Sequence, residues 1–201
     1  MEFIFLIAIL IMSVVIHELA HGYAASYLGD ETARYEGRLT LNPIKHLDPM
    51  GSFFVPLISY SLGGLIIGWA KPVPYNPYNL RPGRWSEAFV AMAGPASNIL
   101  IALVFGLFIR FGTSVNDIEL VQVFSQIVKL NIVLAIFNLV PIPPLDGSKI
   151  IFAFFPKNTY KIRAFYENYG LFFLITFILF FSGFLAPLTM VLYRILTGLS
   201  I

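Results

Sequence analysis

Long apolar runs separated by short polar stretches dominate the pattern of the chain. Runs long enough to cross a bilayer occupy residues 3–28, 86–111 and 120–140, and residues 165–199 hold enough apolar sequence for two C-terminal helices. A helix needs about 20 such residues to span the hydrocarbon core. The pattern therefore predicts an all-α polytopic membrane protein with about five to six membrane helices, three of which form a core.

The stretch between the first two of these runs has a different pattern. Residues 30–50 mix charged side chains with turn-forming residues, which is typical of a small β-hairpin followed by turns. Residues 51–70 are apolar and just long enough to span, but they contain Pro56 and several glycines. Whether this second stretch crosses the membrane is decided below by the topology that the polar residues require.

The sequence His-Glu-Leu-Ala-His at residues 17–21 lies inside the first apolar run. On a helix, His17 and His21 project from the same face, where two neutral imidazoles can hold one zinc ion, and Glu18 can reach a water molecule on that ion. The alternatives are a polar patch in a helix bundle and a chance motif. Three ionisable side chains beside an uncharged apolar run favour a functional site, because such groups are costly within a membrane.

Composition agrees with this placement and narrows the chemistry. Of the 201 residues, 58% are hydrophobic and 12% are charged, values far from those of a soluble domain. The net charge of +2 does not indicate nucleic-acid binding. The absence of Cys excludes thiolate zinc ligands, and a site with three imidazoles would need all three His, including His46. Because Glu2 stands where a signal peptide is basic, an uncleaved first helix is expected.

A second polar interruption follows the run at 120–140. Residues 138–147 read Asn-Leu-Val-Pro-Ile-Pro-Pro-Leu-Asp-Gly, and three prolines in four positions cannot continue a helix. An extended backbone at membrane depth must be buried in protein or line a cavity. Asp146 is the best candidate for a third zinc ligand. As a helix N-cap it is explained equally well, and only the pairing with the two His favours the ligand.

This pairing sets a condition on topology. For Asp146 to face His21, the first helix and the helix over 120–140 must run in the same direction, with one crossing at 86–111 between them. We therefore expect residues 51–70 to be re-entrant or interfacial. The loops on the side of the motif hold most of the basic residues, which places that side in the cytoplasm and the N-terminus outside. These basic residues are Arg34, Arg38, Lys45, Lys71, Arg81, Arg84, Lys149, Lys157, Lys161 and Arg163.

Two asparagines inside spans are candidates for a further role. Asn98 and Asn138 each lie beside a Gly or Pro break, so they are candidate donors to an oxyanion or supports for the substrate. Hydrogen bonding between helices explains them equally well. An extended substrate is expected, held by strand addition at residues 36–42 or along 72–79. His46 is interpreted as a loop histidine, and the alternative is a metal ligand or a residue that hydrogen-bonds one. Lys129 either lies near the outer face or lines a cavity.

Together these residues resemble the signature motifs of the site-2 proteases, the intramembrane zinc metalloproteases. The His-Glu-Leu-Ala-His motif and residues 138–147 carry the resemblance, and Gly94-Pro95-Ala96-Ser97-Asn98 is similar to a further motif on the intervening helix. The resemblance covers about residues 3–155. It implies one zinc ion per chain on His17, His21 and Asp146, with Glu18 as general base.

The resemblance implies that the chain is a short, bacterial-type member without a PDZ or CBS domain, a single membrane-embedded peptidase domain over 1–201. Its expected partners are the lipid bilayer and membrane-anchored protein substrates, cleaved within or near their transmembrane segments, in the plasma membrane with the active site toward the cytoplasm. Two rival hypotheses stay open. A divalent-metal transporter shares intramembrane His and Asp and a broken helix, and a catalytically silent relative would act as a membrane chaperone.

Overall fold

The computed structural model describes residues 2–48, 50–54, 71–112, 118–156 and 159–199. Within these residues the chain is helical and contains no strand. Four helical stretches are long and apolar enough to cross a membrane, at Ile4–Tyr27, Ser86–Gly112, Ile118–Asn138 and Lys161–Thr197. The all-α membrane architecture is therefore as expected, whereas the expected count of five to six spans is not confirmed.

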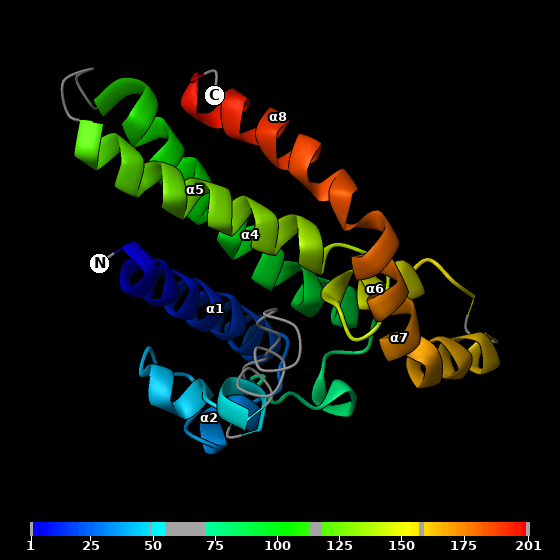
Figure 1. Cartoon of the computed structure of the whole chain (residues 1–201). Helices are drawn as coiled ribbons and strands as arrows, with labels where there is room; N and C mark the ends of the chain where they lie inside the picture. Colours follow the sequence, from blue (N-terminus) through cyan, green and yellow to red (C-terminus); the bar gives the residue numbers. More distant parts are fainter. Residues whose placement is uncertain (1, 49, 55–70, 113–117, 157–158, 200–201) are drawn as a thin grey trace.

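The three spans nearest the N-terminus form a layered core (Figure 1). Helix α4 (Ser86–Leu107), continued by the π-turn η4 (Phe108–Gly112), packs against α1 (Glu2–Tyr27) and α5 (Ile118–Asn138). Figure 1 shows α1 and α5 running in one direction and α4 running in the opposite one. The parallel course that the zinc hypothesis required is present, and it brings the C-terminal ends of α1 and α5 to the same end of the molecule.

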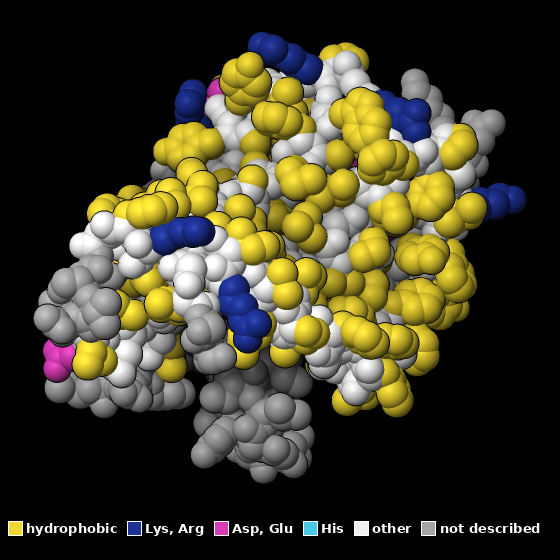
Figure 2. Space-filling view, turned by 90° about the horizontal axis from the view of Figure 1, so that it is seen from above, with side chains coloured by type: hydrophobic (Ala, Val, Ile, Leu, Met, Phe, Trp, Pro, Cys, Tyr) yellow, Lys and Arg dark blue, Asp and Glu magenta, His cyan; other side chains and the backbone are white. Residues whose placement is uncertain are grey.

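The last span consists of two helices that follow one another. Helix α7 (Tyr160–Phe181) leads through the short turn η5 (Ser182–Phe184) into α8 (Leu185–Thr197), which packs on α4 and α5. The two C-terminal helices are thus present, but they form one helical path and not a hairpin, so they count as one span. Figure 2 shows hydrophobic side chains spread over much of the face seen from above, as expected of a surface that faces lipid. A few Lys and Arg side chains interrupt this surface.

The expected β-hairpin at residues 30–50 is not confirmed. The described part of this stretch contains the short helix α2 (Thr32–Tyr35) and the 3₁₀ turn η1 (Pro43–His46). Side chains organise its backbone where a strand ladder was expected: the Asp30 carboxylate accepts from the Thr32 backbone N–H, and the Asn42 side chain accepts from Ile44 N–H. Asx turns of this kind compete with strand pairing.

Most of the expected re-entrant stretch, residues 55–70, lies outside the described residues. Its beginning forms the π-turn η2 (Met50–Phe54). After it, residues 71–76 cross beside α1 as extended chain, and the turn η3 (Pro77–Asn79) leads toward α4. At the other motif, the chain leaves α5 at Asn138, passes the prolines without helix, and resumes as α6 (Asp146–Phe152).

Candidate metal centre

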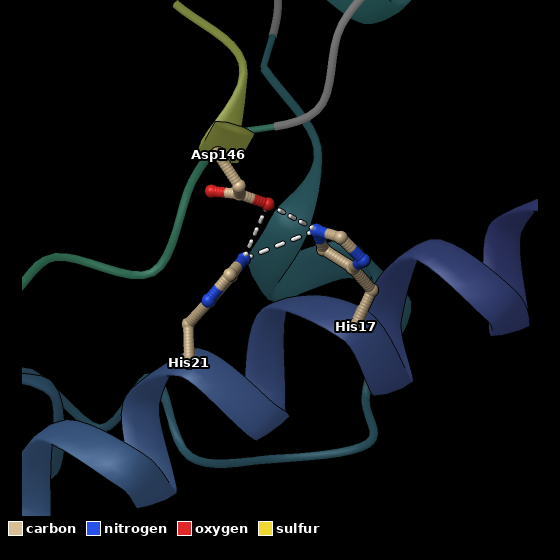
Figure 3. A group of neighbouring side chains, drawn as sticks. All are labelled: His17, His21 and Asp146. Carbon is tan, nitrogen blue, oxygen red and sulfur yellow. Dashed lines mark hydrogen bonds and ion pairs between the residues drawn. The ribbon is translucent and has the colours of Figure 1, made fainter. Parts of the chain in front are cut away.

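Three side chains from two distant parts of the sequence meet at the end of the helical core. His17 and His21 project from the same face of α1, and Asp146, the first residue of α6, points at both (Figure 3). Asp146 Oδ2 lies 3.2 Å from His17 Nε2 and 3.1 Å from His21 Nε2, and the two Nε2 atoms are 3.1 Å apart. All three side chains are buried.

This triangle fits a zinc ion. Tetrahedral zinc with N and O ligands at its usual bond lengths holds neighbouring ligand atoms about 3.3–3.5 Å apart, close to the separations of 3.1–3.2 Å found here. Two imidazoles and one carboxylate form a donor set of the kind that catalytic zinc sites use, with the fourth position left for water or substrate. Among the described residues, this is the group of ligand atoms close enough to hold a metal.

The outer nitrogen of each imidazole is already occupied. His17 Nδ1 lies 2.6 Å from Asn98 Oδ1, and His21 Nδ1 lies 2.7 Å from the Val90 carbonyl oxygen. Since both acceptors are oxygens without a proton at that position, each Nδ1 donates and each Nε2 keeps its lone pair. The lone pairs therefore point to one place, as metal ligation needs.

Asn98 is held by a further buried network. Its Nδ2 donates to Asn131 Oδ1 at 2.9 Å, and Asn131 Nδ2 donates to Ser13 Oγ at 3.0 Å. Asn98 and Asn131 are fully buried. Asn98 thus supports His17 and has no exposed surface for an oxyanion in this structure. Sequence reasoning missed Asn131, although an amide in the middle of an apolar span was a signal for it.

Gly94 on α4 lets the backbone approach both imidazoles. A Cβ at this position would lie 2.6 Å from His17 Nε2 and closer still to His21 Nε2, which no side chain could accommodate without moving the ligands. The Gly-Pro-Ala-Ser-Asn stretch therefore serves the site twice, through the missing side chain of Gly94 and through the carboxamide of Asn98.

Two predicted residues lie apart from the triangle. Asn138 Nδ2 donates to the Leu134 carbonyl of its own helix, at 3.0 Å. His46 is buried, and its Nε2 bonds the Thr40 carbonyl in the same loop, at 2.9 Å. The His46 contact matches the alternative of a loop histidine, whereas the Asn138 bond lies within its own helix and is not the bond between helices given as its alternative.

The Glu18 side chain contacts backbone and not another side chain of the centre. Its Oε2 accepts a hydrogen bond of 2.8 Å from the Val73 N–H, in the extended chain after the undescribed stretch. Glu18 is half-buried, so its other oxygen has room for a partner. This contact was invisible to sequence reasoning, because a backbone N–H has no residue-type signature.

A cavity of about 670 Å³ opens beside the centre. Lys149 lines it, and its Nζ lies 3.9 Å from the second oxygen of Asp146. The Lys149 ammonium therefore places one positive charge beside the Asp146 carboxylate. The other lining residues are Pro72, Pro143, Pro144, Ser148, Phe152, Arg163, Glu167, Gly170 and Leu171.

Comparison with known proteins finds one matching family model and several similar proteins. The model of peptidase family M50 matches residues 108–181, a segment that includes Asp146. The protein YwhC of Bacillus subtilis strain 168, whose name designates it provisionally as a zinc metalloprotease, is 38% identical over 192 residues, which are 92% of this chain and 81% of YwhC. No solved structure matches the chain significantly.

More distant relatives have names of the same kind. Rip2 of Mycolicibacterium smegmatis, also provisionally a zinc metalloprotease, is 35% identical over 150 residues, which are 72% of this chain and 55% of that protein. Rip2 of Mycobacterium tuberculosis H37Rv is 27% identical over 177 residues, which are 88% of this chain and 67% of that protein. The chain thus spans most of YwhC and about half of Rip2 of Mycolicibacterium smegmatis.

Proposed function

The chain belongs to peptidase family M50 and is a zinc metalloprotease, and from this premise we propose that it hydrolyses peptide bonds of membrane-anchored proteins within or near their transmembrane segments. The observation that carries the proposal is the meeting of His17, His21 and Asp146 at the end of the helical core. Ionisable side chains are costly between membrane helices, so a metal centre at this place favours a substrate that lies in the membrane over a soluble one.

We assign the zinc ligands to His17 Nε2, His21 Nε2 and Asp146 Oδ2. When bound there, zinc supplies Lewis acidity and a water molecule of lowered pKa. Asn98 and the Val90 carbonyl fix the orientation of the imidazoles through Nδ1. Burial of the three ligands keeps bulk water from competing for them.

Glu18 is the general base of the proposal. With Oε2 bonded to Val73 N–H, its Oε1 is left to take a proton from the attacking water. The water oxygen forms a bond to the scissile carbonyl carbon, the C–N bond then breaks, and Glu18 returns the proton to the leaving amine. A carboxamide at position 18 cannot accept that proton, although it has nearly the same size.

The substrate must reach this centre in an extended form, since a helix shields its own peptide bonds. Strand addition along residues 72–79 loses support at its beginning. The Arg38 guanidinium already binds the Lys71 and Pro72 carbonyls, and Val73 N–H is bonded to Glu18. The cavity lined by Lys149 reaches the centre through the contact of Lys149 with Asp146, and it supports entry of water from the polar end of the helices.

We propose the plasma membrane as the location, and the basic residues at this end support an orientation with the site toward the cytoplasm. Among the described residues, Arg81, Arg84, Lys149 and Arg163 all belong to segments at the site end of the core. This orientation would be tested by labelling single cysteines placed at Tyr78 and Phe111 from either side of the membrane. Labels at Tyr78 that react only from outside would contradict it.

The decisive experiment is Glu18→Gln. We expect the variant to bind one zinc per chain and to lose cleavage of a membrane-anchored model substrate in liposomes. Unchanged cleavage would refute the mechanism. Vesicle uptake of divalent metal that depends on His17 but not on Glu18 would support the transporter hypothesis instead, and substrate retention without cleavage by the wild type would support a chaperone.

A further inference from the structure

An extended segment, residues 71–76, crosses α1 beside Glu18; we call it the proline strap. Its sequence is Lys-Pro-Val-Pro-Tyr-Asn. Because Pro has no backbone N–H, Val73 holds the one N–H donor among residues 72–74. That donor meets Glu18 Oε2 at 2.8 Å. The strap therefore presents a single backbone donor to the carboxylate that the proposed function makes the general base.

The strap is fixed on both sides of this contact. Before it, Lys71 N–H donates to the His46 carbonyl at 2.8 Å, and the buried Arg38 guanidinium donates to the Lys71 carbonyl at 2.9 Å. After it, Asn76 N–H donates to the buried Asp30 carboxylate at 2.6 Å. Because hydrogen bonds hold the strap at both ends, it does not behave as a lid that lifts away from α1.

The local chain geometry also fixes the direction of the Val73 N–H. Prolines on both sides restrict Val73, which precedes Pro74, to extended conformations. Its side chain is 5% exposed and packs over Gly22 of α1, where a Cβ would lie 2.9 Å from Val73 Cγ1. Side chain and backbone of Val73 are thus both held against the helix that presents Glu18.

A free glutamate on a helix samples several rotamers, and each must be given up when the side chain acts as a base at one place. A fixed donor on one carboxylate oxygen selects a rotamer before the substrate arrives and directs the second oxygen elsewhere. Preorganisation of this kind raises the rate of the chemical step without tightening substrate binding.

We infer that Val73 is a positioning residue for the reaction: its backbone N–H, held by the proline strap, orients Glu18 for proton transfer. The inference rests on the proposed role of Glu18 as the base. It assigns the strap a function that depends on its backbone, so that most side-chain substitutions at position 73 leave the donor in place.

The test compares two variants of the full chain in liposomes. Val73→Pro removes the N–H and places a ring carbon where the hydrogen faced Glu18, whereas Val73→Ala shortens the side chain and keeps the N–H. We expect kcat of Val73→Pro to be at least about tenfold below that of Val73→Ala, the scale seen when outer-shell hydrogen bonds are removed. KM, zinc content per chain and the midpoint of thermal unfolding should match between the two variants.

A second substitution decides the case if Val73→Pro does not fold. Replacing Val73 by its α-hydroxy acid counterpart exchanges the N–H for oxygen and keeps the side chain, and kcat should again fall by about tenfold or more with KM unchanged. Equal kcat with and without the N–H would overturn the inference, and so would a rise in kcat, which would identify the strap as an occluding element. A Glu18→Gln form that cleaves like the wild type would instead overturn the proposed function.

Discussion

Two aspartates that are almost equally buried have opposite surroundings. Asp30, which binds the last residue of the proline strap, is fully buried. Its carboxylate accepts hydrogen bonds from Thr32 N–H, Asn76 N–H and Asn79 Nδ2. Asp146 is 6% exposed, and its Oδ2 faces the Nε2 atoms of two imidazoles. One carboxylate is surrounded by donors and the other by lone pairs.

The difference shows how a buried carboxylate can be interpreted. A buried anion is stable only when its charge is compensated. The donors around Asp30 compensate it within the protein, and they lower the pKa of this carboxyl although burial opposes the shift. Around Asp146 the imidazole N–H groups at Nδ1 are directed away to Asn98 and Val90. A cation at the shared position completes the second arrangement, and the first one needs none.

The largest expected effect separates the two residues directly. Asp146→Asn replaces an anionic ligand by a neutral amide, so we expect zinc affinity and cleavage to fall by more than the 10–100-fold of outer-shell changes. Asp30→Asn should keep one zinc per chain. Zinc content and cleavage rate, measured on both proteins, test this contrast. Loss of zinc in Asp30→Asn and retention in Asp146→Asn would reverse the interpretation of the two sites.

An intermediate effect tests how the imidazoles are supported. Asn98→Ala removes the acceptor of His17 Nδ1 and should weaken zinc binding about 10–100-fold. Asn131→Ala is the matched control, since Asn131 bonds Asn98 but neither imidazole, and its effect should be smaller. A fall in kcat with unchanged zinc affinity in Asn98→Ala would show that Asn98 binds the oxyanion, the alternative raised by the sequence.

The sequence was sufficient for the parts of the site that depend on residue type. Imidazoles and carboxylates are rare in apolar helices, so His17, Glu18, His21 and Asp146 stood out, and the need to bring them together determined the direction of the core helices. The supporting Val90 carbonyl and Val73 N–H did not stand out, because backbone groups are present at every residue. Only three-dimensional contacts reveal which of them face the site.

The errors in the predicted fold have similar causes. Residues 30–50 were expected to pair as strands, but Asp30 and Asn42 draw the backbone into local turns, and side-chain capping of this kind outweighs weak β-propensity. The apolar residues of 165–199 were expected to form two spans. The short turn at Ser182–Phe184 instead continues the helical path. Turn-forming residues indicate a break in a helix but not the direction in which the chain leaves it.

The smallest expected effect concerns Asp30 and is measured as stability. Because its pKa is lowered by folding, its contribution to the free energy of unfolding is fully present above the ordinary carboxyl pKa of about 3.9 and is lost as pH falls toward the lower folded value. Asp30→Asn turns one acceptor into a donor facing other donors and should cost about 1–3 kcal/mol near neutral pH. Glu36→Gln, which changes the same charge at an exposed position, is the control and should cost little. Thermal unfolding in zinc-free buffer measures both variants, and a wild-type stability that rises on acidification below pH 4 would contradict the assignment of Asp30 as a compensated anion.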